Sequence, residues 1–412
     1  MRRNAAIAVL ALGIVATACG GVNDAESGAP ETIADSTEDG TVTETPATTG
    51  GSQPALGVLP DGPSALDTTS ATEFPPALVD PAEIISGGPP PDGIPPLDEP
   101  VFMNVVDALE IFDPSEAVVA LEINGEAKAY PVQVMIWHEI VNDEVGGVPV
   151  SVTYCPLCNS AVTYRREIRG VETTFGTSGR LFASALVMYD RATETLWTHF
   201  DGRAVVGLLA GEQLEAIASP LLSWSDFAET YPTGQVLDPT ATGFNRAYGR
   251  NPYFGYDDAG TEPFLFTGIT DPRAASKDRV VGVEIDGQAV AFALDAISGD
   301  LATATNFTLD TTDIVILWKA GQATALEEDG VGDGRDVGSV GVFLPAIEGQ
   351  ELTFTADGDG FRDNETGSLW NVSGEAVEGD LVGKRLERIN HLDTFWFAWA
   401  TYQPGSDLIE AS

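Results

Sequence analysis

Two stretches decide the fold of this chain, VVALEINGEAKAY at residues 118–130 and VVGVEIDGQAVAF at residues 280–292. Each alternates apolar and polar residues around a two-residue turn, Asn-Gly in the first and Asp-Gly in the second. Such turns are strong signals for a β-hairpin, because both turn residues must tolerate a positive φ. The stretches match position by position over an offset of 162 residues, from 118 to 280, which indicates an internal duplication.

The duplication extends beyond the two hairpins. Residues 190–217, which contain the motif TLW, match residues 363–389, which contain SLW. Further on, LSWSDFAETYP at 222–232 matches TFWFAWATYQP at 394–404. Tryptophans and glycines that recur at a nearly fixed offset over more than a hundred residues are difficult to obtain by chance.

These matches predict a mostly β fold, a β-rich α+β architecture. We expect two pseudo-repeat halves, residues 101–270 and 271–412, each made of antiparallel hairpins with short aromatic helices. The halves differ, because the first contains a cysteine pair in TYCPLCNSAVTY at 153–164 and the middle of the second contains no cysteine. The chemistry is therefore expected in the first half, with the second as structural support.

The N-terminus predicts export. Residues 1–18 have a basic start, a short apolar run and the small-residue sequence Ala-Thr-Ala, which is the pattern of a secretory signal peptide. Cys19 follows directly, as in the lipobox of bacterial lipoproteins, so we expect lipidation at Cys19 and anchoring at the extracytoplasmic face of the cell membrane. Cleavage after Ala18 without lipidation is the alternative, and it gives a freely secreted protein.

Residues 19–100 are rich in Ser, Thr, Gly, Pro and acidic residues and contain no Lys or Arg. Such a composition buries little apolar surface, so a disordered acidic tether is expected. The whole chain carries a formal net charge of −43. Nucleic acid is therefore excluded as a partner, because its phosphates would be repelled. A small molecule or an envelope protein remains as the class of partner.

Cys155 and Cys158 could act in four ways. A C-P-x-C turn directs both sulfurs toward one metal ion, and imidazole is the usual complement. In an oxidising compartment the pair could instead form a small structural disulfide. A cysteine–histidine nucleophile is also compatible with the sequence. A thioredoxin-like redox site is disfavoured, because the residues that follow alternate as in a strand and do not begin a helix.

The chain has three histidines. His138, in IWHEIVND, lies on the segment that leads to the strand ending at Cys155, and it is the preferred third ligand. His199 and His391 are weaker candidates, since a lone histidine is more often a polar core residue than a ligand.

Several motifs together resemble the domain of unknown function 3179 family, whose members are mainly exported bacterial and archaeal proteins. They are WHEIVND, PVSVTYCPLCNSAVTYRR, FGTSGRLFASALVMYDRATETLW and FWFAWATYQP. The resemblance implies that the family's signature residues fall on His138 and Glu139, Cys155 and Cys158, Ser178 with its flanking glycines, and Asp190 and Arg191. It implies no reaction. His199 stands where we expect another polar residue in relatives, which makes it the weaker ligand.

The leading hypothesis is an extracytoplasmic lipoprotein that binds zinc or copper. Cys155, Cys158 and His138 would hold the ion, and Glu139, Asp190, Arg191, Ser178 and Arg180 would surround it or contact a ligand. One alternative is a non-catalytic envelope module with a Cys155–Cys158 disulfide. A second alternative is a cysteine–histidine hydrolase.

Overall fold

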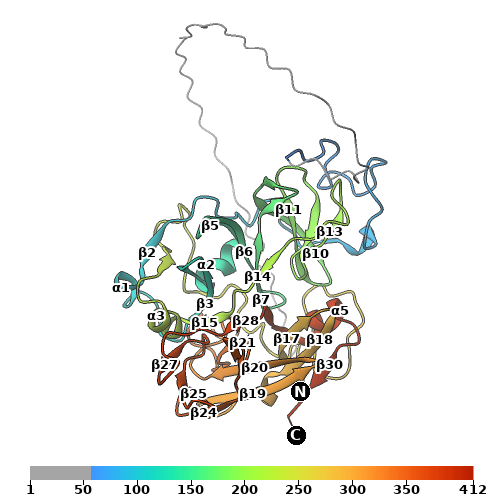
Figure 1. Ribbon diagram of the computed structural model, residues 1–412. Coiled ribbons are helices and arrows are strands. Elements are labelled where there is room, and N and C mark those ends of the chain that lie inside the picture. The colour runs from blue at the N-terminus through green and yellow to red at the C-terminus, as the bar shows by residue number, and fades with distance from the viewer. Residues whose placement is uncertain (1–56, 412) are drawn as a thin grey trace, which may run out of the picture. The chain divides into compact units, whose positions relative to one another are not determined.

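The computed structural model describes residues 57–411 (Figure 1). The predicted signal peptide and the predicted lipidation site Cys19 lie outside these residues. The secondary structure is 40% strand and 9% helix, in several mainly antiparallel sheets, which confirms the mostly β prediction. None of the helices within residues 57–411 has the length and hydropathy needed to span a bilayer.

The first half folds into three main sheets and a small hairpin. The first sheet consists, in spatial order, of β15 (Leu221–Ser223), β3 (Ala117–Ile123), β4 (Glu126–Pro131), β16 (Gln235–Leu237) and β2 (Phe102–Asn104). The second sheet consists of β14 (Ala216–Ile217), β7 (Ser160–Arg165), β6 (Val148–Cys155) and β5 (Ile140–Val145). The third consists of β1 (Ile85–Ser86), β10 (Phe175–Phe182), β11 (Ala185–Asp190), β12 (Leu196–Thr198) and β13 (Ala204–Val206), and the small hairpin pairs β8 (Glu167–Ile168) with β9 (Val171–Glu172).

The second half also has three main sheets and a small hairpin. Their strands are β29 (His391–Phe395), β17 (Arg279–Ile285), β18 (Gln288–Ala293) and β30 (Asp407–Ile409); β28 (Glu387–Arg388), β21 (Ser339–Leu344), β20 (Thr312–Lys319) and β19 (Ala302–Leu309); β24 (Phe354–Asp357), β25 (Gly360–Asp363), β26 (Leu369–Trp370) and β27 (Ala376–Glu378); and β22 (Ala346–Ile347) with β23 (Gln350–Glu351). The helices of the whole described chain are η1 (Pro81–Glu83), α1 (Val105–Ala108), α2 (Val132–His138), α3 (Trp224–Thr230), α4 (Leu294–Ile297) and α5 (Trp396–Tyr402).

The two predicted hairpins form as expected. Strands β3 and β4 turn at Asn124 and Gly125, with φ of 51° and 83°, and β17 and β18 turn at Asp286 and Gly287, with φ of 52° and 78°. In each half the first strand of the hairpin has an antiparallel neighbour (β15 or β29) and the second a parallel one (β16 or β30). The strand orders of the two halves therefore correspond, while their origin by duplication stays a prediction.

The segment 57–100, which the sequence analysis placed in a disordered tether, is packed against the first half. Strand β1 pairs with β10, and the backbone of Leu97 bonds to both Ile140 and Asn142 of β5. Leu97 is 5% exposed and Ala65 is fully buried. The composition of the segment did not reveal these few apolar anchors. The rest of the predicted tether, residues 19–56, lies outside the described residues.

The halves share their hydrophobic core. One cluster combines Val118 and Phe227 of the first half with Leu317 and Phe343 of the second. The largest cluster surrounds Cys155 and Cys158 and extends into helix α5 of the second half. The cysteine loop is therefore enclosed by both halves of the chain.

Candidate metal centre

The turn between β6 and β7 positions the two cysteines. Cys155 is the last residue of β6 and pairs with Ser160, the first residue of β7. Asn159 adopts a positive φ of 50° and closes the turn through its N–H, which donates to the carbonyl of Pro156 at 3.3 Å. A strand follows the pair, as predicted, so the helix N-terminus that activates thioredoxin-like thiols is absent from this turn.

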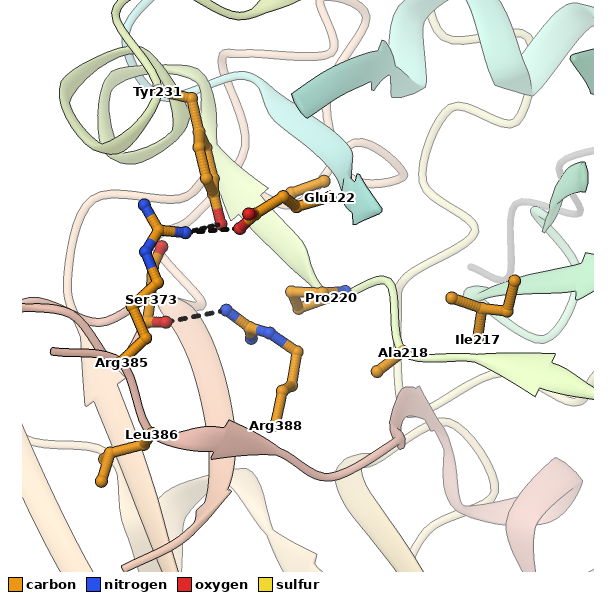
Figure 2. Close-up of a pocket in the computed structure, with 10 residues that line it drawn as sticks. Glu122, Ile217, Ala218, Pro220, Tyr231, Ser373, Arg385, Leu386 and Arg388 are labelled. Atoms are coloured by element: carbon orange, nitrogen blue, oxygen red, sulfur yellow. Dashed lines mark hydrogen bonds and ion pairs between the residues drawn. The ribbon is translucent and has the colours of Figure 1, made fainter. Parts of the chain in front are cut away.

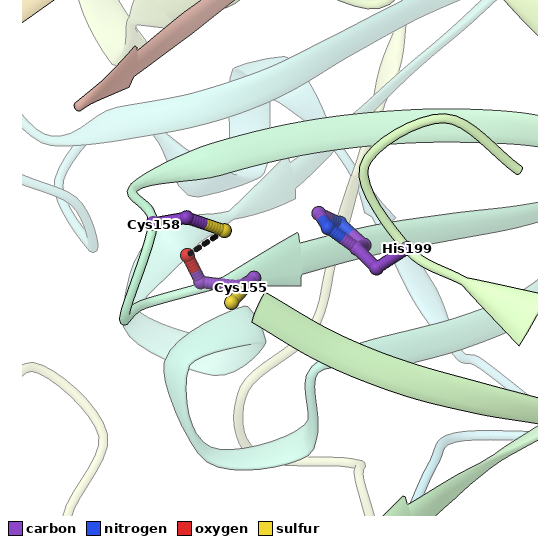
Figure 3. A group of neighbouring side chains, drawn as sticks. All are labelled: Cys155, Cys158 and His199. Atoms are coloured by element: carbon purple, nitrogen blue, oxygen red, sulfur yellow. Dashed lines mark hydrogen bonds between the residues drawn. The ribbon is translucent and has the colours of Figure 1, made fainter. Parts of the chain in front are cut away.

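His199 lies beside the two sulfurs (Figure 3). It directly follows β12, and its N–H donates to the carbonyl of Leu186 on β11 at 3.0 Å. A ring nitrogen of His199 and the sulfurs of Cys155 and Cys158 all lie within 4.8 Å of one another. Two separate strand pairs, β6–β7 and β11–β12, thus bring three metal-binding side chains together.

The group is cut off from solvent. Cys155 is 1% exposed, and Cys158 and His199 are fully buried. Both cysteines are free thiols. Neither ring nitrogen of His199 has a hydrogen-bond partner among residues 57–411, although both are buried. Burial lowers the pKa of His199 to about 3, so the imidazole is neutral and can offer a lone pair to a metal.

The two thiols differ in acidity. Burial raises the pKa of Cys155, but hydrogen bonds from Cys158 and from the backbone, including the Leu186 N–H at 3.4 Å, outweigh it and hold the pKa below its ordinary value. Burial and the neighbouring Cys155 raise the pKa of Cys158 well above its ordinary value. Cys155 is therefore the first thiolate available to a metal.

The predicted third ligand, His138, is engaged elsewhere. Its Nδ1 lies 2.7 Å from the carbonyl of Pro95, and its Nε2 lies 2.6 Å from the hydroxyl of Tyr248. The only group of three metal-binding side chains within residues 57–411 contains His199 and not His138. The candidate metal centre therefore contains His199 in place of His138. His138 was the predicted ligand because it is close to Cys155 along the chain. Helix α2 instead directs the His138 ring toward the 57–100 segment.

The chain belongs to the DUF3179 family. The family model, described as a protein of unknown function, matches residues 91–406. A search of curated proteins and a search of solved structures each found no match.

In this DUF3179 protein the other predicted site residues have separate partners. Asp190 accepts hydrogen bonds from Trp197 and Thr193. Arg191 pairs with the carboxylates of Asp92 and Asp98. The Ser178 hydroxyl donates to the carbonyl of Val187. The Arg180 guanidinium donates to the carbonyls of Ala65 and Leu66. None of these described side chains bonds to the ring of His199, and their contacts instead join neighbouring strands or hold the 57–100 segment.

Glu139 is the predicted neighbour that does lie near the site of the DUF3179 protein. It is 7% exposed, and burial raises the pKa of its carboxyl well above its usual range, with a further contribution from the charge of Cys155. Its backbone has a φ of 59°, and its carbonyl accepts from the N–H of Tyr154 at 2.8 Å. A protonated Glu139 adds no charge beside the thiolate.

The second half holds the cysteine loop from outside. The carbonyl of Cys158 accepts from the Thr394 hydroxyl at 2.8 Å and from the Phe395 N–H at 3.1 Å, both on β29. Within the first half, the hydroxyl of Tyr256 also donates to the carbonyl of Leu157 at 3.0 Å. Strand β29 of the second half thus contacts the cysteine loop of the first half directly.

Asp393, on the same strand, gives a pH-dependent stability. Burial raises the pKa of its carboxyl to about 7, partly opposed by Arg279. His391 lies 3.8 Å away, but burial lowers its pKa to about 4, so it is neutral at higher pH. Because the unfolded pKa of an aspartate is about 3.9, Asp393 contributes stability that is fully present below about pH 4 and is lost as the pH rises through about 7.

We therefore expect Asp393→Asn to be more stable than the wild type at pH 8 by about 1–3 kcal/mol and nearly equal to it at pH 4. Urea unfolding at both pH values measures the difference, with the exposed Asp300→Asn variant as the control. An equal difference at pH 4 and pH 8 would contradict the prediction.

Proposed function

We propose that this chain is an exported, lipid-anchored protein that binds one zinc(II) or copper(I) ion through Cys155, Cys158 and His199. The observation that supports this best is the imidazole of His199, which is buried beside two thiols and has no hydrogen-bond partner at either nitrogen in the described part of the chain. An unpaired buried polar atom costs about 1–3 kcal/mol. Coordination would give one of the two nitrogens a partner.

The donor set favours a soft or borderline ion. Thiolate sulfur binds zinc at about 2.3 Å and imidazole nitrogen at about 2.0–2.1 Å, so small side-chain adjustments would close the group around one ion. Zinc(II) with two thiolates gives a neutral buried centre but prefers a fourth ligand. Copper(I) is also bound well by soft thiolates, but a centre of one copper(I) ion and two thiolates carries one net negative charge.

The burial of the site supports metal binding over the two alternatives. A cysteine–histidine nucleophile must reach its substrate, and the sulfurs of Cys155 and Cys158 are almost completely covered. A structural disulfide would leave His199 without a role, whereas both thiols are free beside it. Export rests on the N-terminal signal pattern and anchoring on Cys19.

Metal analysis tests the proposal. We expect the full chain, purified without oxygen, to contain about one equivalent of zinc or copper by mass spectrometry, and Cys155→Ser/Cys158→Ser to contain less than about a tenth. Metal content near zero in the wild type, or equal content in the variant, would overturn it. Thiol titration of the denatured wild type separates the disulfide alternative, because a pair oxidised in the folded protein gives no reactive thiols at these two positions.

A further inference from the structure

A cavity of about 220 Å³ lies between the two halves, and none of the three residues of the metal centre lines it (Figure 2). Glu122 and Tyr231 of the first half face Arg385 and Arg388 of the second. Apolar side chains, among them Pro220, form much of the remaining wall. A cavity of this size is smaller than the pockets that hold drug-sized molecules, so it suits a ligand with few heavy atoms.

Arg388 is a largely buried cation in this wall, and its charge is only partly compensated. Its Nη2 donates to the carbonyl of Ser373 at 3.0 Å, and its guanidinium lies 4.8 Å from the centre of the Phe343 ring. Its Nη1 is buried and has no acceptor among residues 57–411. Burial lowers the pKa of the guanidinium, and the neighbouring Tyr231 and Glu122 offset the loss of water only in part. A buried charged donor without a partner is costly, and an anion would remove that cost.

The neighbouring Arg385 is already neutralised. It pairs with Glu122, and its Nη2 lies 2.7 Å from a carboxylate oxygen of Glu375. Its Nη1 also donates to the hydroxyl oxygen of Tyr231 at 3.4 Å, which leaves the hydroxyl hydrogen of Tyr231 free to donate. The chain has 63 acidic and 20 basic residues, so carboxylates are abundant as partners. Among residues 57–411 no carboxylate forms an ion pair with Arg388, which leaves its Nη1 available to an external anion.

We propose that this cavity binds a small organic monocarboxylate, with Arg388 as the charge partner and the Tyr231 hydroxyl as a second donor. The planar guanidinium matches a carboxylate in a two-bond geometry. The apolar wall, including Ala120 and Leu386, would contact a short hydrocarbon portion. Glu122 disfavours a doubly charged phosphate, because a second negative charge is repelled more strongly than one.

Calorimetric titration of the full chain with sodium butyrate tests the proposal. We expect one saturable site, at least tenfold weaker binding in Arg388→Gln, and about three- to tenfold weaker binding in Tyr231→Phe. Arg362→Gln is the control, since Arg362 is an arginine outside this cavity that pairs with Asp357. Arg388→Gln should keep its metal, so this result is independent of the metal proposal.

Two further titrations of the wild type keep the test decisive if Arg388→Gln folds poorly. Butyramide, which has the same shape without the charge, should not bind, and inorganic phosphate should bind more weakly than butyrate. No saturable binding of butyrate, equal binding of butyramide, tighter binding of phosphate, or unchanged affinity in a folded Arg388→Gln variant would each overturn the proposal.

Discussion

Replacing His199 with asparagine should remove the metal from the protein, lowering its content from about one equivalent per chain to less than about a tenth. The imidazole is the only nitrogen donor in the group, and two thiolates alone form an incomplete coordination shell for zinc. Mass spectrometry of anaerobically purified protein measures the loss. The variant should stay folded, because neither ring nitrogen of His199 forms a hydrogen bond with any described residue.

His138→Asn is the matched control for this experiment. His138 is also fully buried, but its two nitrogens lie against Pro95 and Tyr248. We expect this variant to lose stability and to keep its metal. If instead His138→Asn lost the metal and His199→Asn retained it, the original sequence-based choice of ligand would be right and the site described above would be wrong.

Replacing Asp190 with alanine should cost about 3–5 kcal/mol of unfolding free energy. Asp190 is fully buried and accepts from the indole N–H of Trp197 at 2.9 Å and from both the N–H and the hydroxyl of Thr193, at 2.7 and 2.9 Å. Removing the carboxylate leaves these buried donors unpaired. Because Trp197 is two residues before His199, we also expect weaker metal retention.

The second half offers a matched variant for Asp190→Ala. Asp363 is fully buried and accepts from the indole N–H of Trp370 at 3.0 Å and from the hydroxyl of Thr366 at 2.8 Å. Asp363→Ala should lose a similar amount of stability and keep its metal, since no member of the metal group lies in that half. Urea unfolding followed by tryptophan fluorescence measures both variants. A loss below about 1 kcal/mol in either would contradict the assigned role of the carboxylate.

Local sequence signals predicted the regular parts of the fold well. The Asn124-Gly125 and Asp286-Gly287 turns and the aromatic helices α3 and α5 all form where the pattern placed them. These features depend on residues adjacent in the chain. The packing of residues 57–100 depends on a few distant contacts, such as that of Leu97 with β5, which composition does not report.

The site was predicted in part for the same reason. Cys155 and Cys158 are close in sequence and were identified, whereas His199 reaches them only through the pairing of β11 with β12. A signal did exist in the repeat. In the matched segments His199 stands opposite Val372, so it is present only in the half that carries the cysteines. Arg388 could not be found in this way, because its cavity is formed by both halves together.

The two hydrogen bonds from β29 to the carbonyl of Cys158 have a thermodynamic consequence. An ion that binds more tightly when β29 is bonded to the cysteine loop must also stabilise the contact between β29 and the loop. The two effects equal the same coupling free energy, because linkage is reciprocal. Removing the ion would then weaken the interface between the two halves, and separating the halves would release the ion. If an ion binds as proposed, its occupancy would depend on the packing of both halves and not on the three ligands alone.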